Sequence, residues 1–131
     1  MSPSETVPPL PPWLDAMLPF ARRQLDIEDG RGAPQQVHVI DHGARDAPVV
    51  VMIHGNPTWS FLWRKVIRAL PHLRCVAPDL IGLGLSSKPR DPSWHTVNQH
   101  ADVLVQVLQA LEVRRCVLAA QDWGGPFALA L

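Results

Sequence analysis

The sequence predicts an α/β domain with a mostly parallel sheet and flanking helices. Three segments, Pro48–Ile53, Cys75–Ala77 and Cys116–Ala120, are apolar without alternation. Strands of this kind are buried on both faces, as in parallel sheets that are covered by helices. Two amphipathic stripes lie between these segments. The order is therefore strand, helix, strand, helix, strand, which is the βαβ arrangement of an open α/β sheet.

Residues 1–16 are expected to form a proline-rich flexible arm ahead of an incomplete core domain that spans 17–131. Five prolines fall within Met1–Pro12, and this composition favours a disordered or loosely docked segment. The following stretch, Trp13–Phe20, is predicted to be a short helix or a hydrophobic anchor onto the domain.

Two half-exposed antiparallel strands are predicted at Arg22–Glu28 and Gln36–Asp41, because polar and apolar residues alternate there around a glycine-rich break. Later in the chain, one helix is expected to follow an N-cap at Ser60 and another an N-cap at Asn98. Both have apolar stripes with helical spacing. The first stripe comprises Leu62, Trp63, Val66, Ile67 and Leu70, and the second comprises Leu104, Val107, Leu108 and Leu111.

Composition argues against several classes of function. Hydrophobic residues make up 47% of the 131, and twelve acidic residues balance twelve basic ones. A neutral chain without a basic stripe gives no reason to expect a nucleic acid partner, and no apolar run is long enough to span a membrane. No signal peptide is evident, and nothing in the sequence assigns an oligomeric state.

The two cysteines, Cys75 and Cys116, each start a predicted strand and are expected to be isolated core thiols. Isolated buried thiols fit a reducing compartment better than a disulfide framework does. The cysteines therefore predict a cytoplasmic protein.

The most informative segment is an apolar strand that runs into a sharp turn at Asp122. Small residues stand two positions before it (Ala120) and two and three positions after it (Gly124 and Gly125). This spacing is typical of a nucleophile elbow, in which the nucleophile has a strained backbone and the next helix packs closely against it. Aspartate in place of serine moves the expected chemistry from acyl transfer towards attack at a saturated carbon.

A carboxylate is ionised at neutral pH, so Asp122 needs no partner base to displace a leaving group from carbon. The departing anion needs donors, and the indole N–H of Trp123 and the amide N–H of Asn56 are neutral donors suited to a halide. Asn56 and Asp122 follow two of the predicted parallel strands, and such turns converge where open α/β sheets bind ligands. The backbone N–H groups of Asn56 and Trp123 would form an oxyanion hole for hydrolysis of the resulting ester.

Three motifs stand in order along the chain, at His54–Ser60, Ala77–Ser86 and Gln121–Gly125. Together they resemble the α/β-hydrolase superfamily, and within it the haloalkane dehalogenases, from about Arg22 onwards. The resemblance implies an α/β-hydrolase fold and an alkyl-ester intermediate on Asp122. It also implies a small apolar halogenated substrate, water as the second substrate, and no cofactor or metal.

Structural explanations compete at each of these positions. Asp122 is a favoured helix N-cap, Trp123 can serve core packing, and Asn56 can simply form a turn before Pro57.

Other polar residues are expected to have no catalytic part. His54 is interpreted as structural and Asp79 as fixing its loop, whereas His95 and His100 are expected to be solvated. The segment Gly82–Ser87 lacks the third glycine of a dinucleotide-binding fingerprint and follows the wrong strand for one. A serine hydrolase would need serine at position 122, and no Gly-x-Ser-x-Gly segment occurs elsewhere.

In this fold the nucleophile precedes the catalytic acid and the histidine, and only nine residues follow Asp122 (131 minus 122). We therefore expect an amino-terminal portion of the fold, truncated before the cap, with the acid and the histidine beyond Leu131. Alternatives are a fragment of an epoxide hydrolase or of a haloacetate-type dehalogenase and, in another class, a non-catalytic pseudo-hydrolase or inert truncated product. Epoxide hydrolases tend to carry an aromatic residue where Asn56 stands, which favours the dehalogenase.

Overall fold

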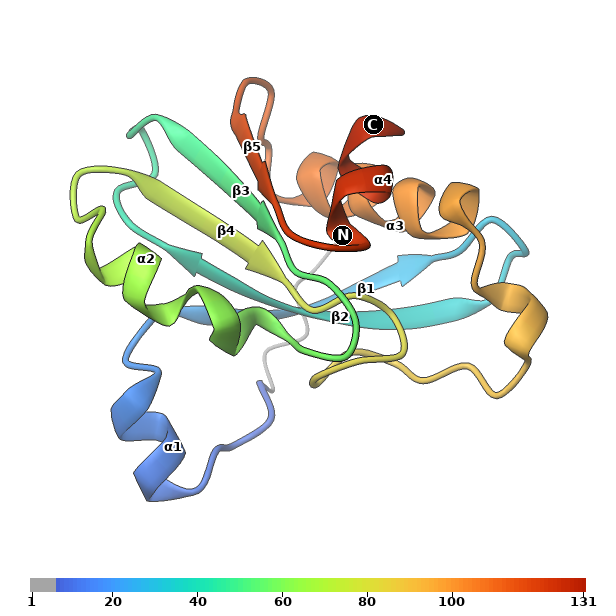
Figure 1. Cartoon of the computed structure of the whole chain (residues 1–131), viewed down its shortest axis with the longest axis horizontal. Coiled ribbons are helices and arrows are strands. Elements are labelled where there is room, and N and C mark those ends of the chain that lie inside the picture. Colours follow the sequence, from blue (N-terminus) through green and yellow to red (C-terminus); the bar gives the residue numbers. More distant parts are fainter. Residues whose placement is uncertain (1–6) are drawn as a thin grey trace.

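A five-stranded sheet in the order β1-β2-β4-β3-β5 forms the centre of the molecule (Figure 1). The computed structural model describes residues 7–131. In chain order the elements are α1 (Pro12–Met17), β1 (Arg22–Glu28), β2 (Pro34–His42), β3 (Val49–Ile53), η1 (Ser60–Trp63), α2 (Arg64–Arg68), β4 (Arg74–Pro78), η2 (Pro92–Trp94), α3 (Val97–Ala110), β5 (Val117–Ala120) and α4 (Gly124–Leu129).

The sheet is mixed. β2 pairs antiparallel with both β1 and β4, whereas β3 pairs parallel with both β4 and β5. All five strands lie where the sequence predicts them, and the alternating pair forms the antiparallel part. The parallel part, β4-β3-β5, comes from the three apolar segments, and it is the part that positions the candidate site.

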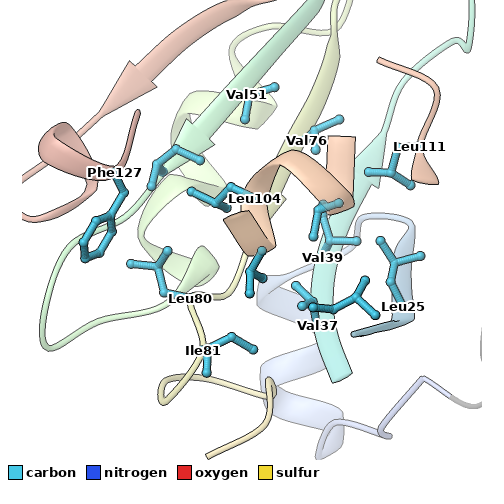
Figure 2. Close-up of a cluster of buried hydrophobic side chains, with 14 of the residues drawn as sticks. Leu25, Val37, Val39, Val51, Val76, Leu80, Ile81, Leu104, Leu111 and Phe127 are labelled. Carbon is cyan, nitrogen blue, oxygen red and sulfur yellow. The ribbon is translucent and has the colours of Figure 1, made fainter. Parts of the chain in front are cut away.

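Helices cover both faces of the sheet, so alternate strand residues enter two different cores. On the face under α3 and α4, Val51 and Val76 pack in a cluster with Leu104 and Phe127 (Figure 2). On the opposite face, Leu18, and Ile67 of α2, pack with buried strand residues, namely Ile40, Met52, Cys75 and Ala77. Burial on both faces explains why β3 and Cys75–Ala77 of β4 are apolar without alternation.

The predicted helix caps are wrong at both helices. Thr96, not Asn98, caps α3, and its side chain accepts a hydrogen bond from the Gln99 amide at 3.1 Å. Ser60 is buried and is the first residue of η1, and its side chain makes no capping bond. Instead the Ser60 amide donates to Asp79 Oδ1 at 2.7 Å.

The apolar stripe predicted for the first helix is only partly buried. Ile67 is 2% exposed, but Leu62 and Val66 are each 40% exposed. The segment starts as a 3₁₀ turn with about 3.0 residues per turn, so the α-helical spacing does not hold across it.

Cys116 is exposed, which contradicts the prediction that both thiols are core residues. It lies just before β5, which is an edge strand of the described sheet, with Val117 64% and Leu118 41% exposed. Cys75 lies on a central strand and is buried as predicted.

The expected arm falls partly outside the described residues, which begin at Val7. Its described part includes α1 except Met17, and the Pro8 carbonyl accepts a hydrogen bond from Arg22 Nη2 at 3.1 Å. Leu18, directly after α1, is 1% exposed and anchors this end of the chain on the sheet. The boundary between arm and domain stays a prediction.

Within residues 7–131 no helix is long and apolar enough to cross a membrane.

Candidate active site

Asp122 lies in the tight turn between β5 and α4 and has a φ of 55°. This left-handed conformation is costly for a residue with a side chain and is concentrated at functional sites. Gly124 permits the turn, because a Cβ there would lie only 2.7 Å from the carbonyl oxygen of His54. Gly125 has open space around it, so close packing requires only the first of the two glycines.

The turn after β3 meets the turn at Asp122. The backbone N–H of Asn56 donates a hydrogen bond to Asp122 Oδ2 at 3.1 Å. Gly55 allows this approach, since a Cβ there would lie 2.7 Å from the same carboxylate oxygen. Two turns that are 66 residues apart in the chain therefore place an amide donor directly on the carboxylate.

Hydrogen bonds from the backbone of Trp123 and of Asn56 hold the pKa of Asp122 below its usual range. The carboxylate is therefore ionised at neutral pH, as a nucleophile at carbon must be. The two amides that stabilise this charge are those predicted to form the oxyanion hole.

A cleft of about 500 Å³ opens beside this turn, and both Asn56 and Trp123 line it. Most of its remaining wall is apolar and includes Leu80, Ile81, Leu83, Val97 and Phe127. Asp122 is not part of the wall, but it is hydrogen-bonded to Asn56, which is. Trp123 is 54% exposed and stacks on Phe127 with 6.3 Å between ring centroids, so core packing does not account for it.

His54 is structural, as predicted. It is 0% exposed, its Nδ1–H donates to the Gly55 carbonyl at 2.7 Å, and its Nε2 accepts from the Leu80 amide at 2.9 Å. Burial lowers its pKa, and both ring nitrogens are occupied, so this neutral imidazole has no free nitrogen with which to act on a substrate.

Asp79 fixes its loop, again as predicted. Its oxygens accept from the backbone amides of Ser60 and Leu85 at 2.7 and 3.0 Å, and from His38 Nδ1 at 2.8 Å. Burial alone would raise the pKa of this carboxyl, but these hydrogen bonds lower it. Asp79 thereby ties the segment after Asn56 to the loop that follows β4.

Sequence reasoning missed His38. It is fully buried on β2, where its Nε2 accepts from Arg22 Nη1 at 3.1 Å while its Nδ1–H donates to Asp79. Alternation in β2 suggested a half-exposed strand, and nothing in that pattern marks a buried imidazole.

His100 is not solvated, which corrects the prediction for this residue. It is 6% exposed and stacks on Phe127 with 4.5 Å between ring centroids. Its position one helical turn before Leu104 places it on the buried face of α3, and this spacing could have revealed it. His95 is exposed, as predicted, yet both histidines line the cleft.

Comparisons with known proteins agree with this geometry. Residues 48–131 match the family model described as the alpha/beta hydrolase fold. Haloalkane dehalogenase 2 of Mycobacterium bovis is 40% identical over 116 residues, which cover 88% of this chain and 38% of that protein. The chain therefore spans about two fifths of the length of this relative.

Two solved structures illustrate the structural likeness. The haloalkane dehalogenase DpaA from Paraglaciecola agarilytica has a TM-score of 0.80 at 35% identity, covering 88% of this chain and 39% of that one. The epoxide hydrolase VrEH1 from Vigna radiata has a TM-score of 0.73 at 31% identity, covering 84% and 35%.

Proposed function

Since the chain belongs to the alpha/beta hydrolase fold family and is a haloalkane dehalogenase-like member of it, we propose that it forms the nucleophile-bearing part of a haloalkane dehalogenase. One observation carries the proposal. The ionised Asp122 is held by the amide of Asn56 at 3.1 Å, and Asn56 and Trp123 line the same apolar cleft.

In the first step a carboxylate oxygen of Asp122 attacks the carbon that bears the halogen. The new C–O bond forms as the carbon–halogen bond breaks, and the bonding pair leaves with the halide. The side-chain N–H groups of Asn56 and Trp123 donate to this anion. Neutral donors suit the task, because a cation here would also pair with Asp122 and weaken it as a nucleophile.

In the second step water attacks the carbonyl carbon of the ester, and the backbone N–H groups of Asn56 and Trp123 stabilise the oxyanion. Collapse releases the alcohol and restores the Asp122 carboxylate. The water must lose a proton to a base, for which His54 is unsuitable because both its nitrogens are hydrogen-bonded. The proposal therefore assigns neither the base nor its supporting acid to a residue between 7 and 131.

Bromide release by the chain tests the proposal. Incubation with a short 1-bromoalkane should release one bromide per folded chain in a single burst, followed by no turnover. Asp122→Asn should release none. Sustained release over many turnovers would show that the chain holds its own base, and no burst from a folded chain would count against Asp122 as the nucleophile.

An epoxide hydrolase is the second candidate, supported by the likeness to the Vigna radiata enzyme. The same nucleophile would open an epoxide, but the leaving oxygen would need a proton rather than halide donors. Asn56, an amide donor on the cleft wall, favours the dehalogenase. A cytoplasmic location also belongs to this proposal, and the buried free thiol of Cys75 supports it.

A further inference from the structure

Two imidazoles interrupt the apolar wall of the cleft that Asn56 and Trp123 also line. His95 follows η2, and His100 lies in the first turn of α3. Nδ1 of His95 lies 3.1 Å from Nε2 of His100, and the rings stack with 5.2 Å between centroids. The proposed function uses neither residue.

Aromatic neighbours fix the pair in place. Trp94 contacts both rings edge to face, at centroid distances of 5.2 and 5.0 Å, and Phe127 stacks on His100. The Trp94 indole is held in turn by Asp29, whose Oδ2 accepts its N–H at 2.8 Å. A pair that is positioned before any ligand arrives loses little conformational entropy on binding.

Gly82, in the loop after β4, leaves space for the ring of His95. A Cβ at position 82 would lie 2.9 Å from Cε1 of His95. Its φ of +94° is also one that glycine adopts most easily. The loop after β4 is thus shaped so that the imidazole can lie against it at the cleft wall.

Each imidazole keeps one ring nitrogen free. Apart from their mutual bond, neither side chain hydrogen-bonds to any residue between 7 and 131. The fully enclosed side-chain atoms without a partner in that range are Gln24 Oε1, Ser60 Oγ and Trp63 Nε1, so the free nitrogen of the buried His100 is not sealed off. Because His100 is 6% exposed and lines the cleft, the unpaired nitrogen marks a place for a polar ligand atom.

The protonation states of the two rings determine which ligand group can bind to their free nitrogens. Burial, aided by the nearby imidazoles of His95 and His54, lowers the pKa of His100 to about 4. When both rings are neutral, one donates to the other, and the pair then presents one free donor and one free acceptor whichever tautomer is present. A hydroxyl group, which both donates and accepts, can pair with either free nitrogen in either tautomer.

We propose that His95 and His100 form a polar subsite that binds a hydroxyl group of the substrate, so that the preferred substrate is a halogenated alcohol. This inference rests on the proposed function. The halogen lies between Asn56 and Trp123, the carbon chain lies along the apolar wall, and the hydroxyl reaches the imidazole pair.

Selectivity measurements test the subsite. The rate of alkyl addition to Asp122 is compared between ω-bromoalkanols and 1-bromoalkanes of equal length, by mass spectrometry of the chain. In His95→Phe and His100→Phe, which keep an aromatic ring in the stack, the preference for the alcohol should fall about fivefold, as for loss of one neutral hydrogen bond. The exposed His72→Phe is the control and should leave the preference unchanged.

Two outcomes would overturn the subsite while leaving the nucleophile intact. They are addition to Asp122 with an unchanged alcohol preference in both variants, and a stronger preference for ω-bromoalkanoates than for the alcohols.

If no compound alkylates Asp122, that result counts against the proposed function. The subsite can then still be tested by a binding experiment. In Asp122→Asn protein with nitrogen-labelled histidine, an ω-bromoalkanol should shift the ring-nitrogen NMR signals of both His95 and His100, whereas the matched 1-bromoalkane should not. Identical spectra with and without the alcohol would overturn the subsite.

Discussion

At the scale of single residues, two glycines decide whether Asp122 can reach its place. Gly55 lies against the Asp122 carboxylate, and Gly124 lies against the backbone of His54 at the end of β3. Both turns therefore meet at distances that exclude a Cβ. Because the candidate site is built from these turns, its geometry depends on residues that carry no functional group.

Gly124→Ala should lower the free energy of unfolding by about 1–3 kcal/mol, the usual cost of overpacking. Gly125→Ala is the matched control. Its new Cβ meets nothing within 4 Å, so it should leave stability unchanged or raise it slightly. Urea unfolding of the two variants measures the difference, and equal effects would contradict this account of the elbow.

Asp29 gives the molecule a specific acid sensitivity. Burial would raise its pKa, but hydrogen bonds from Trp94, Gln35, Ala33 and Arg31 outweigh it and lower the pKa from 3.8 to about 2. A lowered folded-state pKa stabilises the protein above the unfolded-state value, and this stabilisation is lost as the pH falls from about 4 towards 2.

Asp29→Asn tests this assignment. The amide would set N–H groups against the donors of Trp94 and Gln35, so the variant should lose about 1–3 kcal/mol at neutral pH. The difference in stability between wild type and variant should shrink as the pH approaches 2. A difference that stays constant from pH 6 to pH 2 would show that Asp29 does not titrate as described.

At the scale of elements, the sequence predicts that α3 exists, but it does not determine which residue caps the start of this helix. Thr96 and Asn98 are both favourable cap residues, and only the extended backbone at Thr96 places a side-chain oxygen near the Gln99 amide.

Thr96→Ala should lower the free energy of unfolding by about 1 kcal/mol, and Asn98→Ala, the control, should lower it by less. The reverse order in thermal unfolding would contradict the observed cap.

The strands could be predicted because their signal is strong and local. The three apolar segments without alternation are all strands, and β3 and β4 are largely buried, as predicted. The prediction of burial on both faces is wrong for β5, which is exposed because it is an edge strand of the described sheet. The prediction that His100 is solvated is wrong, although its place one helical turn before Leu104 already puts it on the buried face of α3. The contact with Phe127 of α4 could not be predicted, because it depends on how two helices pack. The turns at Asn56 and Asp122 were placed correctly relative to each other, because the parallel order of β3 and β5 follows from the strand pattern.

At the scale of the whole molecule, β5 presents an exposed apolar edge of the sheet. Val117 and Leu118 are exposed on a strand that pairs on one side only among residues 7–131. Edges of this kind template pairing with other chains. The isolated chain is therefore expected to self-associate and to bind dyes that report exposed apolar surface.

Val117→Lys should reduce this association, because a charge at a strand edge opposes pairing. Val105→Lys is the control, since Val105 is similarly apolar and 37% exposed but lies on α3. Light scattering after size exclusion compares the two. Equal reduction by both variants would mean that general solubility, rather than the β5 edge, sets the association state.

Asp122 is proposed to be a nucleophile towards halogenated carbon, and intact-mass spectrometry of the chain tests this role. The folded chain, verified by circular dichroism, is incubated with a short 1-bromoalkane and, separately, with the corresponding epoxide. The bromoalkane should give a single alkyl adduct that maps to Asp122 and is absent in Asp122→Asn. An unmodified chain, or an adduct formed only by the epoxide, would contradict it.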